Sequence, residues 1–239
     1  MTRHNAVNPK DHKATRVIRK RSVNMGDGAM ASFTFPDEFR KIQDEYAILF
    51  QKNLERDEFS CLAMMGFENG ENLFLNDDDT WDARYIPMAM DVQPFLIGRS
   101  EENPEQQTMV IDMDSPRVSK TDGEALFDEQ GQATPFLKGM TQRLGMLNHG
   151  HQQSKHYIEA LRKYELLEPL SIDVTLQDGS KNRLMGFHTI HEEKLQSLET
   201  TALEDFQKHG WLLASYMVMA SHSNLSSLID RKNDVNLHG

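Results

Sequence analysis

Apolar and polar side chains alternate along residues 170–176, and an Asp-Gly pair follows at Asp178-Gly179. Ile172 and Val174 fall on one face of this segment and Asp173 on the other, because successive side chains of a β-strand point to opposite faces. Asp-Gly between two such runs is a strong hairpin signal, since both residues tolerate positive φ. Residues 170–187 therefore predict a β-hairpin, and with it an antiparallel sheet.

A second hairpin is predicted for residues 60–76, where Asn69-Gly70 separates two apolar runs. Helical periodicity extends between the two hairpins, from Phe136 to about Tyr164. Helices thus interleave with hairpins along the chain. The fold class expected is α+β: a mixed, largely antiparallel sheet with hairpins, one long helix near residues 135–165 and several short helices.

The sequence indicates where the long helix starts and also suggests a possible break in its middle. Thr134 suits the N-cap and Pro135 the first helical position. Each glycine inside a helix costs about 1 kcal/mol relative to alanine. Three glycines, of which Gly150 is the last, lie in this segment, so a break near residues 148–151 is one possibility.

The chain has 239 residues, which suits one large domain or two small ones. We see no internal repeat and no long linker. We expect a polar tail at residues 1–13, a single α+β domain over residues 14–232, and a second polar tail at residues 233–239.

Charge is distributed unevenly. Residues 1–30 contain seven Lys or Arg residues against two Asp, a net charge of +5, in a chain whose net charge is −11. An acidic chain repels phosphate backbones, so we expect no nucleic-acid partner. The basic segment suits a solvated tail, a fold back onto the acidic body, or contact with an anionic partner.

Cysteine content and hydropathy indicate the compartment. The one cysteine, Cys61, excludes an internal disulfide and sits in an apolar run typical of a buried, inert thiol. No apolar stretch resembles a signal-peptide core, and no window is long enough to span a bilayer. We therefore expect a soluble, cytoplasmic protein with no transmembrane segment.

Residues 81–95 combine aromatic and proline residues at a corner. Pro87 suits the start of a helical turn, whereas Pro94 ends it and leads into a strand, because proline fixes φ and lacks an amide proton. Trp81, Tyr85 and Phe95 either pack under this corner or contact a ligand or peptide, as loop aromatics often do. The candidate binding residues are Trp81, Tyr85, Pro87, Pro94 and Phe95.

Histidine is the one distinctive source of metal ligands. His149, His151 and His156 form one group, and they could converge if the helix breaks at Gly150. His188 and His191 form a second group at a strand-to-helix junction. Neither group has the i, i+4 spacing of HExxH, so surface histidines are the favoured interpretation and a metal site is the alternative.

No motif predicts a catalytic residue. The sequence contains no G-x-S-x-G elbow, no G-x-G-x-x-G and no Walker loop. No cofactor is predicted. The apolar segment at residues 211–223 suits a buried helix or strand, with Met217 and Met219 either filling a core or lining an adaptable binding surface.

The order of several segments resembles the bacterial SapC family over roughly residues 10–232. The resemblance is carried by DEFRKIQDEYAILF, MMGFENGENLFL, WDARYIPMAMDVQPFLIG, VIDMDS, GEALFDEQGQAT, LLEPLSIDVTLQDGSKNRLMGFHTI and GWLLASYMVMASHSNLSSLI. The family takes its name from proteins associated with a bacterial surface layer. It has no established activity, so no catalytic residues carry over.

The resemblance implies an accessory role. Genes of this family tend to lie near those for flavin-dependent halogenase-like proteins, JmjC-type cupins and TonB-dependent receptors. We expect a non-catalytic accessory or binding protein for a protein or peptide partner in a bacterial envelope or surface-associated system. The alternatives are an uncharacterised enzyme, with or without a metal bound by the candidate histidines, and a surface-layer structural subunit. The sequence does not indicate the oligomeric state.

Overall fold

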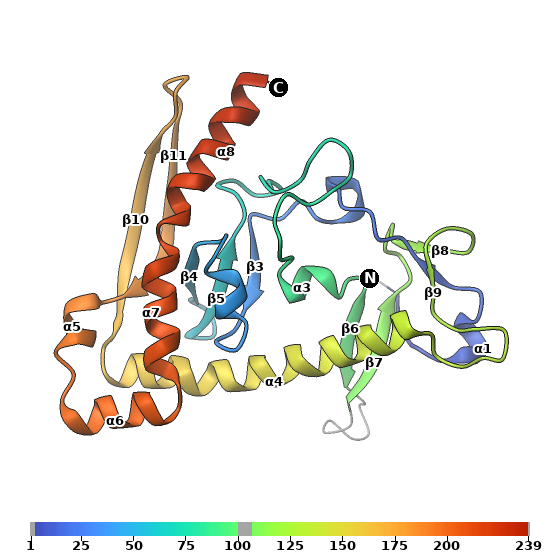
Figure 1. The fold of residues 1–239 in the computed structure, drawn as a ribbon, viewed down its shortest axis with the longest axis horizontal. Coiled ribbons are helices and arrows are strands. Elements are labelled where there is room, and N and C mark those ends of the chain that lie inside the picture. Colours follow the sequence, from blue (N-terminus) through green and yellow to red (C-terminus); the bar gives the residue numbers. More distant parts are fainter. Residues whose placement is uncertain (1–2, 100–106, 239) are drawn as a thin grey trace. The chain divides into compact units, whose positions relative to one another are not determined.

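The computed structural model describes residues 3–99 and 107–238 (Figure 1). Its contacts divide the chain into two compact units. Unit 1 comprises residues 1–28, 75–82 and 88–149, and unit 2 comprises residues 29–74, 83–87 and 150–239. Each unit is thus assembled from three separated stretches of sequence.

Unit 1 contains two small antiparallel sheets. The first has the order β1-β7-β6 and is built from β1 (His4–Ala6), β6 (Phe95–Arg99) and β7 (Gln107–Asp112). The second has the order β8-β2-β9 and is built from β2 (Arg16–Val17), β8 (Val118–Ser119) and β9 (Glu124–Ala125). The helical elements are α1 (Pro9–His12), η1 (Val23–Met25), α3 (Met88–Asp91) and the first part of α4 (Pro135–Lys163).

An apolar cluster joins these sheets to α4. Phe95 and Ile111 face each other across β6 and β7 and are both buried. Leu137, Met140 and Leu144 project from α4 into the same cluster at the spacing of one helix face. The predicted helix thus supplies one side of the unit 1 core.

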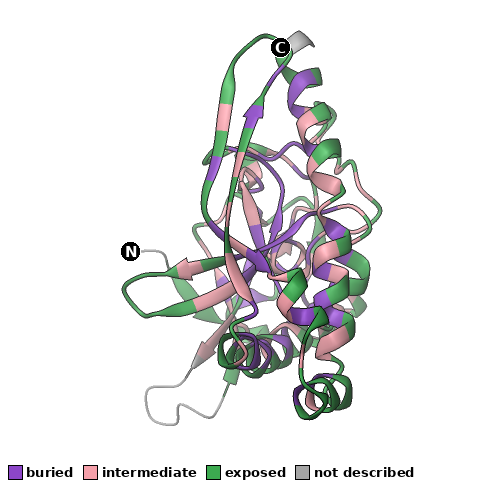
Figure 2. Ribbon diagram, turned by 90° about the vertical axis from the view of Figure 1, so that its left-hand side faces the viewer, coloured by how far each residue is buried: buried purple, intermediate pink, exposed green. Residues whose placement is uncertain are grey.

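Unit 2 contains a five-stranded antiparallel sheet with the order β10-β11-β4-β5-β3. Its strands are β3 (Ala31–Thr34), β4 (Ile48–Asn53), β5 (Glu58–Met64), β10 (Leu167–Thr175) and β11 (Lys181–Ile190). The inner strands β4 and β5 are buried at about half of their positions, whereas most of β10 is exposed or half-buried (Figure 2).

Unit 2 also contains several helices. They are α2 (Phe39–Ile42), α5 (Glu192–Gln196), α6 (Thr200–Lys208), α7 (Trp211–Ser221) and α8 (Asn224–His238), with the second part of α4. The helix α7 packs against α2, β4 and β11. Two hydrogen bonds hold it there: the Ile48 N–H donates to Ser221 Oγ at 2.9 Å, and the hydroxyls of Tyr157 and Ser215 lie 3.0 Å apart.

The hairpin predicted for residues 170–187 is present as β10–β11. Its turn places Gly179 at φ 81°, a conformation that favours glycine because it has no Cβ. The helix α8 runs alongside this hairpin in unit 2 (Figure 1). The Asn233 side chain accepts a hydrogen bond from the Gln177 N–H at 2.9 Å, so α8 and the turn are joined directly.

The hairpin predicted for residues 60–76 does not form. The chain turns at residues 68–71 as expected, but the following Leu73 and Phe74 are buried without forming a strand. The strand β5 pairs instead with β4, through a turn at residues 54–57, and with β3. Since β4 and β3 occupy both edges of β5, no edge remains for residues 72–75 to pair with.

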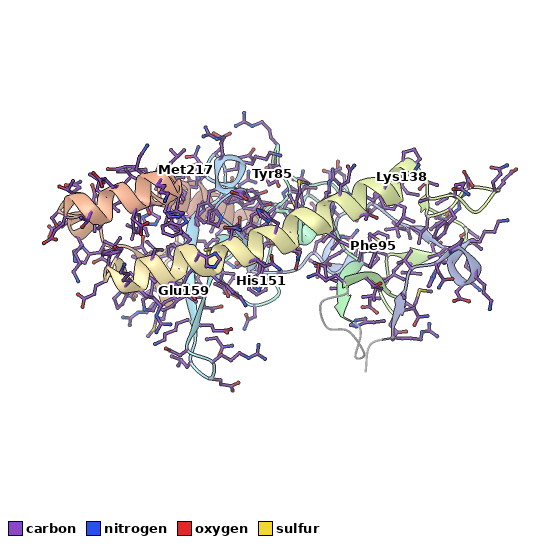
Figure 3. All side chains as sticks on the ribbon, turned by 90° about the horizontal axis from the view of Figure 1, so that it is seen from below. Tyr85, Phe95, Lys138, His151, Glu159 and Met217 are labelled. Carbon is purple, nitrogen blue, oxygen red and sulfur yellow. The ribbon has the colours of Figure 1, made fainter. Side chains whose placement is uncertain are left out.

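The helix α4 continues through residues 148–151, so the break considered there is absent (Figure 3). Gly150 serves close packing instead. A Cβ placed on this residue would lie 2.2 Å from Cδ2 of Phe35. The absent side chain allows the Phe35 ring to approach the helix backbone.

The two segments predicted to be polar tails contain secondary structure. In residues 1–13, β1 pairs with β7, and α1 places His12 in a buried position. At the other end, α8 extends to His238. The single domain expected over residues 14–232 stays a prediction.

Candidate functional site

Three of the five predicted corner residues are buried. Pro87 precedes α3 and Pro94 precedes β6, as the sequence predicted, and the Gln93–Pro94 peptide bond is cis. Phe95 lies in the unit 1 core, with its ring centroid 6.2 Å from that of Phe136. Burial of these three side chains favours the packing interpretation for them.

The other two corner residues are half-buried. Trp81, in unit 1, forms an isolated antiparallel bridge with Leu75. Tyr85, in unit 2, donates its hydroxyl to Glu38 Oε1 at 2.8 Å, and its carbonyl accepts from the Tyr46 hydroxyl at 2.6 Å. Both the side chain and the backbone of Tyr85 are therefore engaged in hydrogen bonds within unit 2. The binding role of the five residues stays a prediction.

The histidines of α4 do not converge. His149, His151 and His156 are all exposed. On a continuous helix, His151 lies about 200° around the axis from His149. His156 shares a face with His149, but their Cα atoms are separated by about 10 Å along the axis. A single ion, with ligand distances of about 2 Å, would not be reached by both imidazoles.

His188 and His191 lie in different surroundings. His188, on β11, packs edge-to-face on Phe59 with a centroid distance of 5.0 Å, and burial, followed by the charge of Lys52, lowers its pKa. His191 is the N-cap of α5 and lines a polar hollow of about 540 Å³. The hollow is also lined by Glu168, Glu192, Glu193 and Gln196.

This hollow contains one weak His–carboxylate contact. His191 Nε2 lies 3.9 Å from Glu168 Oε2, and His191 Nδ1 faces the Lys194 N–H at 3.5 Å. Across the described residues, no group of three or more His, Cys, Asp or Glu side chains is arranged to hold a metal ion. Cys61 is buried, and this burial raises the pKa of its thiol, which keeps it protonated at neutral pH.

The basic N-terminal segment folds back onto acidic residues of unit 1. Asp91, at the end of α3, accepts hydrogen bonds from Arg19 Nη2 at 2.5 Å and Arg21 Nη2 at 2.6 Å on one carboxylate oxygen. Its other oxygen accepts from Arg143 Nη1 of α4 at 2.5 Å. The sequence left three interpretations of the basic segment: a solvated tail, packing onto acidic residues, or contact with an anionic partner. The structure contains packing onto acidic residues.

Asp27 forms the buried half of the same network. It accepts from Arg21 Nη1 at 3.2 Å and from Arg117 Nη2 at 2.5 Å, and both Asp27 and Arg117 are fully buried. Burial, followed by repulsion from Arg117, lowers the pKa of Arg21. We define the arginine network as Arg19, Arg21, Arg117 and Arg143 with Asp27 and Asp91. Sequence patterns did not reveal it, because its members are scattered over 125 positions.

The second marked feature is the surface of α7. The helix carries no charged residue along its eleven positions. One side, with Ala214 and Val218, is buried. On the other side Leu213 and Tyr216 are 50% and 46% exposed, Ala220 is exposed and Met217 is half-buried. We call Leu213, Tyr216, Met217 and Ala220 the outer face of α7.

The sequence predicted the apolar character of the outer face but not its exposure. The segment 211–223 was expected to be buried as a helix or strand; it forms a helix, but is buried on one side only. The side chains of the outer face recur at i, i+3, i+4 and i+7, which places them along one stripe. The signal was the apolar character of both helix sides, since a helix at a protein surface normally carries polar residues on the outside.

None of the helices formed by the described residues has the length and apolar character needed to span a bilayer. The fold and its surfaces define an α+β protein with antiparallel sheets, an apolar helix face and an arginine network. The SapC family model matches residues 7–228, and the chain belongs to the SapC family. No curated protein and no solved structure matches the chain.

Proposed function

We propose that this protein is a non-catalytic binding module that recognises a protein partner through the outer face of α7. The observation that carries the proposal is the exposure of Leu213 and Tyr216 on a helix without charges. Surface stripes of this kind, with residues at i, i+3, i+4 and i+7, are typical of helix-in-groove recognition.

The chemistry of the outer face suits a partner groove. Tyrosine and methionine are enriched in protein interfaces, because they offer a large contact area with adaptable or amphipathic side chains. Tyr216 and Met217 occupy adjacent positions of the stripe. Ala220 allows the partner backbone to approach the last turn of the helix. The partner is therefore expected to present an apolar concave surface.

The family suggests where this partner acts. The family resemblance is the reason for expecting the partner in a bacterial envelope or surface-associated system. A cytoplasmic location of the chain itself is part of the same proposal. Fractionation of the source cells, with detection of this chain in each fraction, tests that location.

The proposal is tested by photo-crosslinking in cells. The crosslinking amino acid p-benzoylphenylalanine replaces Tyr216, and in a matched control it replaces Leu54, which is 84% exposed in the β4–β5 turn of the same unit. We expect irradiation to produce a discrete adduct with another protein from position 216 and none from position 54. The substitution Leu213→Glu, introduced next to the crosslinker, should abolish that adduct.

Folding of the variants is checked by thermal denaturation. Leu213→Glu is a surface substitution and should change the free energy of unfolding by less than about 0.5 kcal/mol. The absence of an adduct at position 216, or identical adducts at positions 216 and 54, would contradict the proposal. An adduct of twice the mass of the chain would show that the partner is a second copy of this protein and not a different protein.

A further inference from the structure

The arginine network contains more positive than negative charge. Four guanidinium groups are arranged around two carboxylates, Asp27 and Asp91, which leaves a surplus of two positive charges. The buried members account for one Arg–Asp pair, because Arg117 and Asp27 are fully enclosed. The surplus therefore belongs to the arginines around Asp91.

This surplus reaches the surface at two side chains. The side chains of Arg19 and Arg143 are 31% and 43% exposed, whereas Arg21 is buried. Both exposed guanidinium groups bind the Asp91 carboxylate, one on each oxygen. Since each nitrogen is within hydrogen-bond distance of the same carboxylate, the two lie no more than about 7 Å apart.

Both guanidinium groups keep donors for a further acceptor. Within the described part of the chain, Arg143 uses Nη1 alone for a hydrogen bond, to Asp91. Arg19 uses Nη1 and Nη2, and its guanidinium lies 5.7 Å from the centroid of the Phe136 ring. Asp91 and Phe136 thus hold the two cations in place while Nε of Arg19 and Nε and Nη2 of Arg143 stay available.

The helix α4 leaves room beside these donors. Phe136, Gly139 and Arg143 follow one another at i, i+3 and i+7, so they lie on one face of the helix. Among the described residues, a Cβ placed on Gly139 would meet no atom within 4 Å beyond the backbone of its own helix turn. In the described part of unit 1, the helix surface at Gly139, between Phe136 and Arg143, is therefore open.

We propose that Arg19 and Arg143 form a binding site for a phosphate group. A phosphomonoester carries a charge of about −1.5 to −2 at pH 7, which offsets the surplus of two. Its oxygens accept charge-assisted hydrogen bonds from guanidinium groups, which are among the strongest in proteins. The spacing of the phosphate oxygens also fits two guanidinium groups whose nitrogens lie no more than about 7 Å apart. This site lies in unit 1 and is independent of the outer face of α7.

The test measures phosphate affinity by ³¹P NMR titration at constant ionic strength. Inorganic phosphate and O-phosphoserine are the two probes, and they distinguish free phosphate from a phosphomonoester. Acetate, in competition, controls for a general anion effect. We expect saturable binding of at least one phosphate probe to the wild type, and a loss of affinity of about tenfold or more in Arg143→Gln.

Arg162→Gln is the matched control. Arg162 lies on the same helix, is 45% exposed, and is paired with Asp57 at 2.7 Å, much as Arg143 is paired with Asp91. This variant should bind phosphate as the wild type does. The proposal is overturned if neither probe binds, if both variants respond equally, or if acetate competes as well as phosphate.

A second variant keeps the test decisive if Arg143→Gln is poorly folded. Gly139→Glu introduces a carboxylate four residues before Arg143, a helix-stabilising spacing, and replaces a helical glycine. It should keep or raise the melting temperature while it abolishes phosphate binding. Gly145→Glu, at another open position of α4, should leave binding intact. Unchanged binding in Gly139→Glu overturns the proposal.

Discussion

Gly150 illustrates how one residue can be misjudged from its type. Its position in a helical segment suggested a break, because glycine weakens helices. The structure has a continuous helix there, with the Phe35 ring packed against the missing side chain. At Gly145, five positions earlier on the same helix, a Cβ would meet no side chain of the described residues within 4 Å. Two glycines of identical helix propensity thus play different roles.

Substitution of alanine separates these roles. Gly150→Ala should lower the free energy of unfolding by about 1–3 kcal/mol, because the new methyl group clashes with Phe35. Gly145→Ala should raise it by about 0.5–1 kcal/mol, through helix propensity alone. Chemical denaturation of both variants provides the measurement. Equal stabilisation by both would show that Phe35 does not pack closely on the helix.

His222 is a second residue whose role emerges from its surroundings. Its Nε2 lies 3.0 Å from the Thr189 hydroxyl of β11, at the end of α7. Burial lowers its pKa from the ordinary value of 6.5. The folded protein therefore binds a proton at His222 less readily than the unfolded chain does.

The sign of the resulting pH dependence follows from this shift. Stability from His222 is fully present above about pH 6.5 and is lost as the pH falls through the lower pKa of the folded state. We expect a decline in melting temperature between pH 7.5 and pH 5 that is shallower in His222→Gln. His149→Gln, which alters an exposed histidine, should retain the slope of the wild type. Parallel slopes in all three proteins would refute this role.

At the scale of elements, the β10–β11 hairpin depends on α8. Alternation and the Asp178-Gly179 turn predicted the hairpin itself, since these signals are local. The sequence predicts a polar tail at residues 233–239, whereas α8 extends to His238. In the structure Asn233 is buried and accepts a hydrogen bond from the Gln177 N–H.

Loss of this contact should be visible at the hairpin turn. Asn233→Ala removes the acceptor for the Gln177 N–H and should cost about 1–2 kcal/mol. Amide hydrogen exchange at residues 176–180 should become faster. Asn236→Ala, which removes an exposed contact to Asp178, should have a much smaller effect. Unchanged exchange in Asn233→Ala would show that α8 does not stabilise the turn.

At the scale of the whole molecule, residues distant in sequence assemble each unit. Asp27 and Arg117 are separated by 90 positions and form a buried ion pair at 2.5 Å. Arg21 joins this pair to Asp91. Arg21 of the basic N-terminal segment therefore lies in the interior of unit 1, and the segment is not a free arm.

Removal of the Asp27 charge tests this assembly. Asp27→Asn leaves Arg117 buried without a counter-charge and should destabilise the protein by about 3–5 kcal/mol. Asp114→Asn alters an exposed pair with Arg3, and should change stability by less than about 1 kcal/mol. Denaturant titration of the two variants compares them directly. A small, equal effect in both would mean that the pair contributes little to unit 1.

Local signals account for the elements that were predicted correctly. The Thr134 cap, the Pro135 start and the hairpin at Asp178-Gly179 depend on residues within a few positions of one another, where propensity and turn chemistry act. The membership of the SapC family and the α+β class also followed from the sequence. The hairpin at residues 60–76 failed because pairing depends on which edges of β5 are free.

Tertiary structure alone decided the features on which the proposed function and the proposed phosphate site rest. Leu213 and Tyr216 lie on the exposed side of α7 and Ala214 and Val218 on its buried side, and hydropathy cannot distinguish two apolar sides. Arg19, Asp91 and Arg143 become neighbours only when α3, α4 and the N-terminal segment pack together. Sequence by itself determined the local elements, because their energies are local; packing determined the surfaces and the charge network, because those arise from long-range contacts.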